Sequence, residues 1–556
     1  MFSIGAIMIK TENVKENLYV ITNRRFPSDN YGNADYLNNW PMLYILENGD
    51  KVYIGESTNV AERMKQHYNN HEKREFNQVH FIYSDRFNQS VTFDYESKLI
   101  QFISADRKFT ITNKNDGIAN KNYFKKPDYD DTFEELWNEL RSYNLAEHTL
   151  EQIKNSEFYK YSPFKELNKD QKKLADDIIF EIRAGKKLPI VVEGRPGTGK
   201  TIVAVYLMKY LRDYQDERTH EYTFRSMKTG LIIPQTSLRA TLKSLFKKIE
   251  GLASKDVIGA SEAVKAESWD ILFVDEAQKL QVRRSIVGYQ AYDNNNKKLG
   301  LPGDATELDW ILKIAKTPVF FFDPDQLSGP SGTTIEVFED KVKLELGRRE
   351  RIGAYVAHFL KMQMRVKGGE EYINYVNDIL HDIDVPKKTF AEYDFKIFSD
   401  FGRFNRELYV KENDMELCRM LAGYAWEWKT KNDKTAFDIE IEGIRKRWNH
   451  CLNNWINSDG AIDEVGCIHT SAGYDLNYAF VILGKDIKYD DVHHKIYVDR
   501  SRYYDKRGKQ SATDEELDLY IRNIYYVLMT RGIMGTYLYV CDDKLRDHFM
   551  KYVERF

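Results

Sequence analysis

The sequence predicts an α/β protein in which a small mixed α+β domain precedes a larger region built on doubly wound parallel sheet. From about Lys165 onward, apolar runs of strand length alternate with helical patterns, which is typical of a parallel sheet. Earlier, the apolar runs Met42–Leu46 and Lys51–Gly55 flank Asn48-Gly49, and Asn-Gly in that position is a strong hairpin signal. With 556 residues, the chain should hold about three or four domains.

The amino-acid composition indicates which broad classes of protein this chain can belong to. Hydrophobic residues make up 42% and charged residues 30% of the chain, which indicates a globular protein. The net charge is only −4, so any nucleic-acid contact must come from local basic patches. The four cysteines are far apart and lack metal-ligand spacing, which favours a reduced, cytoplasmic protein. The first ten residues lack the basic start of a signal peptide, and no apolar stretch approaches the ~18 residues of a membrane helix. We therefore expect no membrane partner.

The stretch Leu188–Leu211 predicts a nucleotide-binding loop between a strand and a helix, and it fits the pattern G-x-x-x-x-G-K-[ST]. Glycines let backbone N–H groups point at phosphate oxygens, and the helix N-terminus adds partial positive charge. Lys200 would reach the β- and γ-phosphates, and Thr201 would offer its hydroxyl to Mg²⁺. We expect ATP and Mg²⁺ as cofactors. The residues expected to bind the nucleotide here are Gly194, Gly197, Thr198, Gly199, Lys200 and Thr201.

A later strand ends in two acidic residues. The apolar run Ile271–Val274 is followed directly by Asp275 and Glu276. At the carboxyl end of such a strand, Asp275 would hold Mg²⁺, partly through water. Glu276 would orient or deprotonate the water that attacks the γ-phosphate. Together with the phosphate loop, this pair predicts hydrolysis of the nucleotide.

The small first domain is predicted to continue beyond its hairpin with short strands and two helices. We expect a strand at Leu18–Thr22, a helix at Val60–Tyr68 capped by Thr58 or Asn59, a strand at Val79–Tyr83, a helix at Val91–Ala105 and a short strand at Thr110–Thr112.

Five residues of this domain carry a resemblance to a known family. Tyr53-Ile54-Gly55 reads as one short motif, and Leu43-Tyr44 as another in which Met42-Leu43 stands where Gly-Ile is usual. In these motifs, and in an arginine, a glutamate and an asparagine that follow at matching places, the region resembles the GIY-YIG endonuclease family. The resemblance implies catalytic roles for Tyr44, Tyr53, Arg63, Glu96 and Asn113, with Glu96 as the metal ligand.

The chemistry of phosphodiester cleavage suits these residue types. A tyrosine phenol can act as general base if its pKa is lowered, and a single carboxylate suits Mg²⁺, which keeps water and phosphate as its other ligands. Arg63 would neutralise charge that grows on the phosphorus centre. His67 lies one helical turn after Arg63, either on the surface or on the same catalytic face. Taken singly, each tyrosine could be a strand aromatic and Glu96 a capping or salt-bridge residue.

Further motifs resemble those of superfamily 1 helicases. Gln171 precedes the phosphate loop where that superfamily has its adenine-reading glutamine. Asp323 with Gln326 resembles the motif that senses the γ-phosphate. Arg365 and Arg531 stand in segments that resemble arginine-bearing motifs, which implies that both reach the nucleotide and that Arg531 acts as an arginine finger. A late motif departs from the pattern, with Ala472 in place of glutamine and Asp475 in place of glutamate.

Taken together, Lys165 to Phe556 resembles the uncharacterised ATPase family related to the helicase domain of Schlafen proteins, which implies two RecA-like lobes. The expected domains are a GIY-YIG-like nuclease domain at 1–125, a helical connector at 126–164, a first lobe at 165–345 and a second at 346–556.

The combination predicts an ATP-dependent protein that processes nucleic acid, DNA in preference to RNA, with a Mg²⁺-dependent endonuclease attached. From the resemblance we expect bacterial defence against phage or mobile DNA. Two alternatives stay open. The protein could be a DNA repair translocase with a nuclease, or ATP binding could act as a switch that gates the nuclease without unwinding.

Overall fold

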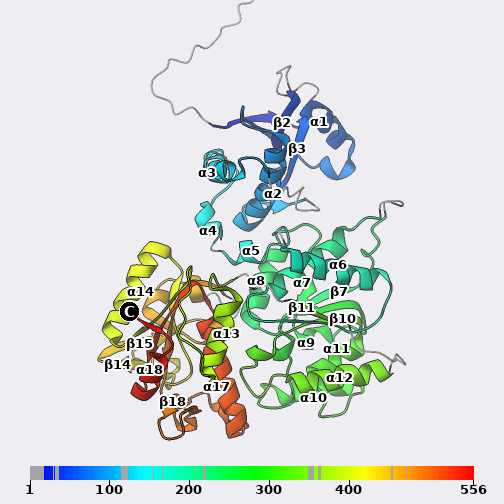
Figure 1. Cartoon of the computed structure of the whole chain (residues 1–556). Helices are drawn as coiled ribbons and strands as arrows, with labels where there is room; N and C mark the ends of the chain where they lie inside the picture. The colour runs from blue at the N-terminus through cyan, green and yellow to red at the C-terminus, as the bar shows by residue number, and fades with distance from the viewer. Residues whose placement is uncertain are drawn as a thin grey trace, which may run out of the picture. The chain divides into compact units, whose positions relative to one another are not determined.

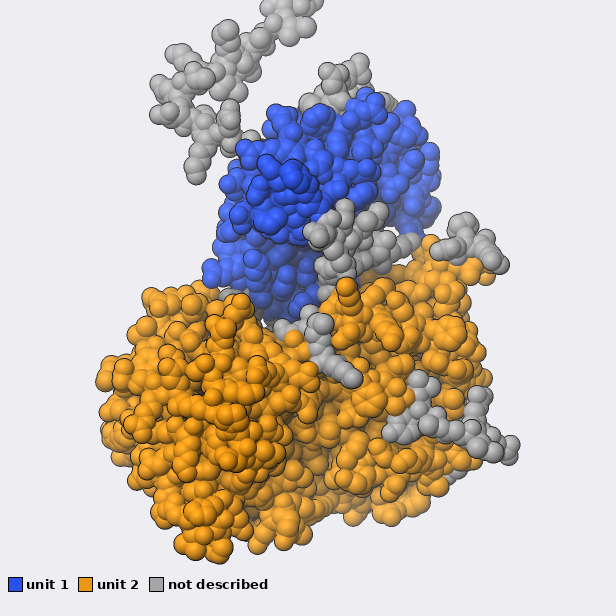
Figure 2. All heavy atoms as spheres, in the orientation of Figure 1, with its two compact units in different colours: residues 1–166, 245–251 blue, residues 167–244, 252–556 orange. Residues whose placement is uncertain are grey.

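A computed structural model of the chain describes residues 18–28, 31, 37–113, 123–154, 156–165, 167–216, 219, 221–348, 356–360, 363, 365–452, 455–471 and 474–556. Ala472 of the late helicase-like motif lies outside these residues. The chain forms two compact units (Figure 2). The first contains residues 1–166 together with Leu245–Gly251, and the second contains Leu167–Ser244 and Leu252–Phe556.

The first unit is built on a five-stranded sheet in the order β1-β4-β2-β3-β5. Neighbouring strands run antiparallel, except β5, which lies parallel to β3. The strands are β1 (Val20–Arg25), β2 (Asn38–Glu47), β3 (Lys51–Asn59), β4 (Gln78–Tyr83) and β5 (Thr110–Ile111). The helices are α1 (Val60–Asn69), α2 (Gln89–Asp106), α3 (Lys126–Ser142), α4 (Leu150–Lys154) and α5 (Glu157–Lys160). The helices expected as a connector, α3 to α5, all contact α2 within this unit (Figure 1).

Local sequence explains the turn and the cap that shape this unit. Gly49 adopts a φ of +91°, which favours glycine, and the Asn48 side chain accepts a hydrogen bond from the Lys51 N–H at 2.9 Å. The resulting hairpin pairs Tyr44 with Gly55 across β2 and β3. The Asn59 side chain then caps α1 by accepting from the Glu62 N–H at 3.1 Å. Tyr44 thereby lies opposite the glycine that ends the Tyr53-Ile54-Gly55 motif.

The chain enters the first unit a second time at Leu245–Gly251. Ile111 of β5 donates its N–H to the Lys248 carbonyl at 3.3 Å, and its own carbonyl accepts from the Glu250 N–H at 3.2 Å. These bonds form a parallel bridge between Ile111 and Ile249. The edge of the sheet at β5 is therefore paired with this later segment.

The second unit contains two lobes, and the first lobe is a parallel sheet in the order β11-β6-β10-β9-β7-β8. Its strands are β6 (Ile190–Gly194), β7 (Thr229–Ile232), β8 (Val257–Ile258), β9 (Trp269–Val274), β10 (Ala315–Phe322) and β11 (Val356–Leu360). Its helices are α6 (Lys169–Arg183), α7 (Lys200–Asp213), α8 (Thr236–Phe246), α9 (Ala260–Ala263), α10 (Tyr289–Leu299), α11 (Glu307–Ile314) and α12 (Ile335–Arg348). Helices lie on both sides of this sheet (Figure 1).

The second lobe is an eight-stranded sheet in the order β14-β15-β16-β13-β17-β20-β12-β21, parallel except for the β14–β15 pair, with a separate β18–β19 hairpin. Its strands are β12 (Asp394–Phe398), β13 (Cys418–Ala422), β14 (Ile439–Ile441), β15 (Ile444–Trp448), β16 (Glu464–Gly466), β17 (Leu476–Leu483), β18 (Ile487–Asp490), β19 (Lys495–Val498), β20 (Gly532–Val540) and β21 (Glu554–Arg555). Its helices are α13 (Gly369–Leu380), α14 (Phe401–Met415), α15 (Ile468–Ser471), α16 (Lys506–Gln510), α17 (Asp514–Met529) and α18 (Asp543–Phe549). The predicted fold class, a small α+β domain followed by two RecA-like lobes, is confirmed.

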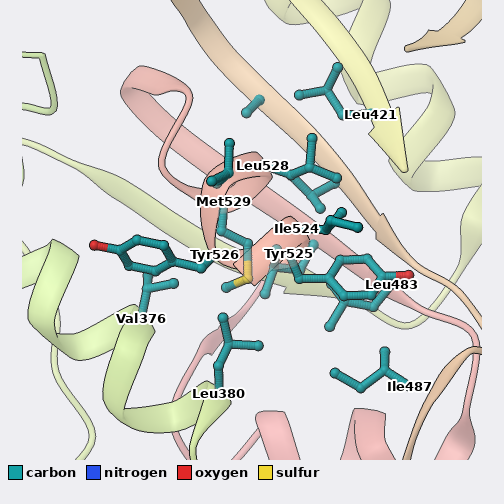
Figure 3. Packing of buried hydrophobic residues seen from close by; sticks show 14 of the residues in the cluster. Val376, Leu380, Leu421, Leu483, Ile487, Ile524, Tyr525, Tyr526, Leu528 and Met529 are labelled. Atoms are coloured by element: carbon teal, nitrogen blue, oxygen red, sulfur yellow. The ribbon is translucent and has the colours of Figure 1, made fainter. Parts of the chain in front are cut away.

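Helix α17 forms the centre of the second lobe's core. Tyr525 and Leu528 are fully buried, and they belong to a cluster that also holds Val376 and Leu380 of α13 and Leu483 of β17 (Figure 3). A helix buried on most of its surface must be apolar nearly all round, as the sequence Ile524–Met529 is. The helix ends just before Arg531, so this packing fixes where that arginine lies. Across the described residues, the model has no helix with the length and apolar character needed to span a membrane.

Candidate functional site

The nuclease-like residues converge in the first unit. Tyr44 on β2 and Tyr53 on β3 have ring centroids 6.3 Å apart, and Arg63 on α1 donates from Nε to the Tyr44 hydroxyl at 3.3 Å. Gly55 is needed beside them, because a Cβ atom at this position would overlap the Tyr44 hydroxyl. Burial, followed by the neighbouring Tyr53, raises the pKa of Tyr44 well above its ordinary value, so this phenol keeps its proton.

His67 completes this cluster, which settles its place on the same face as Arg63. Its Nε2 lies 2.8 Å from the Tyr44 hydroxyl, and the residue is only 5% exposed. Burial, with the positive charges of Arg63 and Lys73, lowers the pKa of His67 to about 3. The imidazole is therefore neutral at ordinary pH, and its Nε2 is hydrogen-bonded to the Tyr44 hydroxyl.

Lys73 is a buried cation that belongs to no recognisable motif of the sequence. Its Nζ lies 3.3 Å from the centroid of the Tyr53 ring, over the ring face, in a cation–π contact. The residue is 8% exposed and sits at the end of a short 3₁₀ helix, His71–Lys73.

Glu96 on α2 lies beside a second carboxylate, Glu56 of β3. Burial, followed by the charge of Glu56, raises the pKa of Glu96 to about 7, although the Glu56 backbone N–H donates to it. One oxygen of Glu56, Oε2, is buried without a hydrogen-bond partner in the part of the chain that the structure describes. Two close carboxylates with an unsatisfied oxygen fit a Mg²⁺ ion, which binds through one or two carboxylates, phosphate and water. No group of three or more His, Cys, Asp or Glu side chains suited to a metal occurs among the described residues.

Asn113 holds the strand that carries Tyr53. Its Oδ1 accepts from the Ile54 N–H at 3.0 Å, and its Nδ2 donates to the Ile54 carbonyl at 2.8 Å. The side chain is 2% exposed, and both ends of the amide bind backbone. Asn113 thus acts on the site through β3 and is a positioning residue.

In the second unit, the phosphate loop joins β6 to α7. Gly197 and Gly199 have φ of +81° and +86°, which strongly favour glycine. Lys200 is 5% exposed, and its Nζ donates to Asp323 Oδ2 at 2.9 Å and to the carbonyls of Gly194 and Arg195. The lysine is therefore held inside the loop by one carboxylate and two carbonyls, all of which a phosphate would have to replace.

The acidic pair after β9 faces this loop. Thr201 donates from Oγ1 to Asp275 Oδ2 at 2.5 Å, which joins the two residues expected to hold Mg²⁺. Burial and the charge of Glu276 raise the pKa of Asp275. Although burial opposes its ionisation, Lys279 and Lys200 hold the pKa of Glu276 below its ordinary value. A charged Glu276 suits a group that orients or deprotonates water.

A chain of polar contacts runs from Asp323 to the second lobe. Gln326 donates from Nε2 to Asp323 Oδ2 at 2.6 Å, and Arg531 Nη2 donates to Gln326 Oε1 at 3.5 Å. Arg531 is 2% exposed. Arg365 is instead paired with Asp475, the residue that replaces glutamate in the late motif. Arg531 therefore lies against the residues around Lys200, whereas the Arg365 side chain is paired with Asp475.

Two glutamine side chains donate hydrogen bonds to backbone carbonyls of the phosphate loop. The Gln171 amide donates to the Thr198 carbonyl at 2.9 Å and accepts from the Asn168 N–H at 3.1 Å, and the residue is 1% exposed. The Gln363 amide donates to the Pro196 carbonyl. The adenine-reading role expected of Gln171 remains a prediction, since its amide already binds backbone at both ends. Gln363 was missed because a lone glutamine between apolar residues has no local signal.

A cleft of about 1050 Å³ lies between the two lobes of the second unit. The first lobe contributes Gln235, Ser237 and Lys279, and the second contributes aromatic and basic side chains. These are Tyr424, Trp426, Trp428, Lys431, Tyr504, Lys506 and Arg507. These aromatic residues belong to no motif that the sequence singles out, because the residues opposite them in the cleft come from distant parts of the chain.

Comparison with known families identifies both parts. A family model described as GIY-YIG catalytic domain matches residues 41–108, and one described as Schlafen group 3, DNA/RNA helicase domain matches residues 187–542. The fold and these matches define the class: a nuclease domain joined to a helicase-like domain, as in proteins that process nucleic acids. The chain belongs to the Schlafen group 3 helicase family. Both resemblances seen in the sequence are confirmed.

The chain is also similar to a yeast protein and to solved helicase structures. The uncharacterised protein YPL245W of Saccharomyces cerevisiae (strain ATCC 204508 / S288c) is 24% identical over 435 residues, which cover 69% of this chain and 90% of that protein. Pif1 helicases solved in work on DNA unwinding at forked double-stranded DNA share 14% identity at a TM-score of 0.26, over 67% of this chain and 92% of theirs. The DUF1998 helicase MrfA bound to DNA shares 8% identity at a TM-score of 0.28, over 71% and 50%.

We predict that Arg531→Ala lowers the kcat of ATP hydrolysis by about 10³–10⁵, the cost of losing an arginine finger. Steady-state phosphate release measures kcat, and binding of a fluorescent ATP analogue confirms that the nucleotide site is still folded. Arg502→Ala, at an exposed position of the same lobe, is the matched control and should behave as the parent. If Arg531→Ala hydrolyses ATP with the parental kcat, Arg531 is not part of the hydrolysis site.

Proposed function

We propose that this protein is an ATP-dependent nucleic-acid-processing enzyme that cuts DNA in a Mg²⁺-dependent reaction. The observation that carries the proposal is the cluster of Tyr44, Arg63 and His67 beside Glu96. It combines a proton acceptor, a fixed cation and a carboxylate, which are the groups that hydrolysis of a phosphodiester requires. The match of the same region to GIY-YIG catalytic domains supports it.

In the proposed reaction, water attacks phosphorus and loses its proton to the Tyr44 oxygen while the phenol's own proton moves to His67 Nε2. A neutral His67 can take that proton, and its transfer keeps Tyr44 from carrying a buried negative charge. Because burial, Arg63 and Lys73 disfavour a charged imidazole, His67 then releases the proton to solvent. Arg63 offsets the charge that grows at phosphorus as the bond to the leaving oxygen breaks. Glu96 would hold Mg²⁺, which when bound neutralises phosphate charge and acidifies water. The leaving alkoxide takes a proton from solvent.

We propose that the second unit hydrolyses ATP and binds a single strand in the cleft between its lobes. Lys200 would exchange Asp323 for the phosphates, Asp275 and Thr201 would hold Mg²⁺, and Glu276 would orient water. In the cleft, Trp426 and Trp428 are partly exposed, and Lys431 lies 4.3 Å from the Trp428 ring centroid. Aromatic faces beside cations suit stacked bases and a phosphate backbone.

The biological setting that we propose is defence against phage or mobile DNA, and the pairing of a nuclease with an NTPase in one chain supports it. A repair translocase with a nuclease would use the same residues and would differ by preferring branched or damaged DNA. A switch that gates cutting without unwinding is favoured by one observation, the pairing of the Arg365 side chain with Asp475 of the late motif.

The nuclease assignment predicts that Glu96→Ala abolishes cleavage of DNA in the presence of Mg²⁺ and leaves ATP hydrolysis at the parental rate. Cleavage is measured on single-stranded, double-stranded and branched DNA and on matching RNA, with and without ATP. Glu62→Ala, at an exposed position of α1, is the control. If Glu96→Ala cleaves DNA at the parental rate, the nuclease assignment is wrong. If the parent cleaves only RNA, the substrate is RNA and not DNA.

The cleft predicts that Trp428→Ala weakens binding of single-stranded DNA by about 5- to 150-fold, since stacking contributes about 1–3 kcal/mol per base. Fluorescence anisotropy with a labelled oligonucleotide measures the affinity. Tyr497→Ala changes a 39% exposed aromatic of β19 that does not line the cleft, and it should bind as the parent does. Equal losses in both variants would place the strand elsewhere.

The switch hypothesis predicts that Lys200→Ala changes DNA cleavage as well as abolishing ATP hydrolysis. A strand-displacement assay on the parent accompanies this test, because a switch should show DNA-stimulated hydrolysis without unwinding, whereas a translocase should separate the strands. If Lys200→Ala cuts every substrate at the parental rate, the two activities are independent.

A further inference from the structure

Glu56 is a carboxylate that none of the expected nuclease residues includes. It follows Gly55 on β3, directly after the Tyr53-Ile54-Gly55 motif, and its register partner on β2 is Leu43. Its backbone N–H donates to Glu96, so the two acidic side chains come from adjoining points of β3 and α2. The position therefore lies at the metal-binding end of the proposed nuclease site.

The surroundings of Glu56 do not account for its charge. The Thr92 hydroxyl lies within hydrogen-bonding reach of the carboxylate, but it donates to the Gln89 carbonyl at 3.1 Å. The nearby cation is Arg63, whose guanidinium is already bonded to the Tyr44 hydroxyl and, at 3.0 Å, to Gln66. The Oε2 atom remains buried and without a donor among the residues described by the structure. A buried carboxylate oxygen with no partner is costly unless something else binds it.

We propose that Glu56 is a second carboxylate ligand of the divalent cation that Glu96 holds. This inference rests on the proposed nuclease function. A cation between the two side chains satisfies the unpaired oxygen of Glu56 and removes the repulsion between two adjacent negative charges. Two carboxylates leave positions for water and for the phosphate of the substrate, as Mg²⁺ requires. Glu56 then fixes the ion relative to β3, the strand that also carries Tyr53.

The effect of Glu56→Gln on the stability of the protein shows whether Glu56 is a metal ligand or a residue that only supports the fold. Without metal, Glu56→Gln removes one of two adjacent negative charges, so at pH 8 the first unit should be as stable as the parent or more stable. With metal, the parent should gain more stability than the variant, because only the native state binds the ion tightly. If Glu56 only supports the fold, Glu56→Gln would lower the stability of the protein both with and without metal.

The test is titration of the nucleotide-free full-length protein with Mn²⁺ by isothermal calorimetry at pH 8, paired with thermal unfolding with and without Mn²⁺. We expect Glu56→Gln and Glu96→Gln each to weaken Mn²⁺ binding by about tenfold or more and to lose the metal-induced rise in Tm. Glu62→Gln should match the parent. Asp275→Asn, in the same series, identifies any heat from the nucleotide site.

The outcomes separate this inference from the proposed function. If Glu56→Gln binds Mn²⁺ like the parent while Glu96→Gln does not, Glu56 is no ligand and the nuclease proposal stands. If Glu56→Gln lowers Tm equally with and without Mn²⁺, its role is structural and the inference is overturned. If the parent neither binds Mn²⁺ in a Glu96-dependent way nor cuts DNA, the nuclease proposal falls together with the inference.

Discussion

The ion pair between Lys200 and Asp323 is the contact on which the organisation of the second unit depends. Both groups are almost completely buried, and two buried charges persist only when they are paired and hydrogen-bonded. Asp323 also accepts from Gln326, which contacts Arg531 of the other lobe. A triphosphate that draws Lys200 away from Asp323 thus alters a network that reaches across both lobes. This gives nucleotide binding a direct physical route to the cleft.

In the first unit, burial keeps Tyr44 uncharged, and the buried histidine beside it is also neutral. Burial raises the pKa of Tyr44, and a neutral His67 stands ready as the acceptor of its proton. The positive charges of Arg63 and Lys73 both favour the neutral imidazole, so the same cations that would stabilise phosphate also keep the acceptor unprotonated. The charge state of each side chain depends on its neighbours, so the role of a single residue of this site cannot be predicted from that residue alone.

Much of the fold was predictable, because its signals are local. The hairpin at Asn48-Gly49, the cap at Asn59 and the loop before Lys200 each depend on a few adjacent residues whose conformational preferences are strong. The partners of those residues were not predictable in the same way. The Tyr44–His67 bond, the cation over Tyr53 and the cleft aromatics join positions that meet only once the strands have paired. The unpaired oxygen of Glu56 became visible only from burial, which a sequence does not record.

The second entry of the chain into the first unit limits how the gene can be divided. The edge strand β5 is paired at Ile111 with a segment that is encoded after the phosphate loop. A fragment that stops at residue 166 would leave that edge without its bridge, and open sheet edges invite association with other chains. A nuclease domain transplanted at one junction would therefore lose this pairing, because a short segment from within the helicase-like sequence completes the sheet of the first unit.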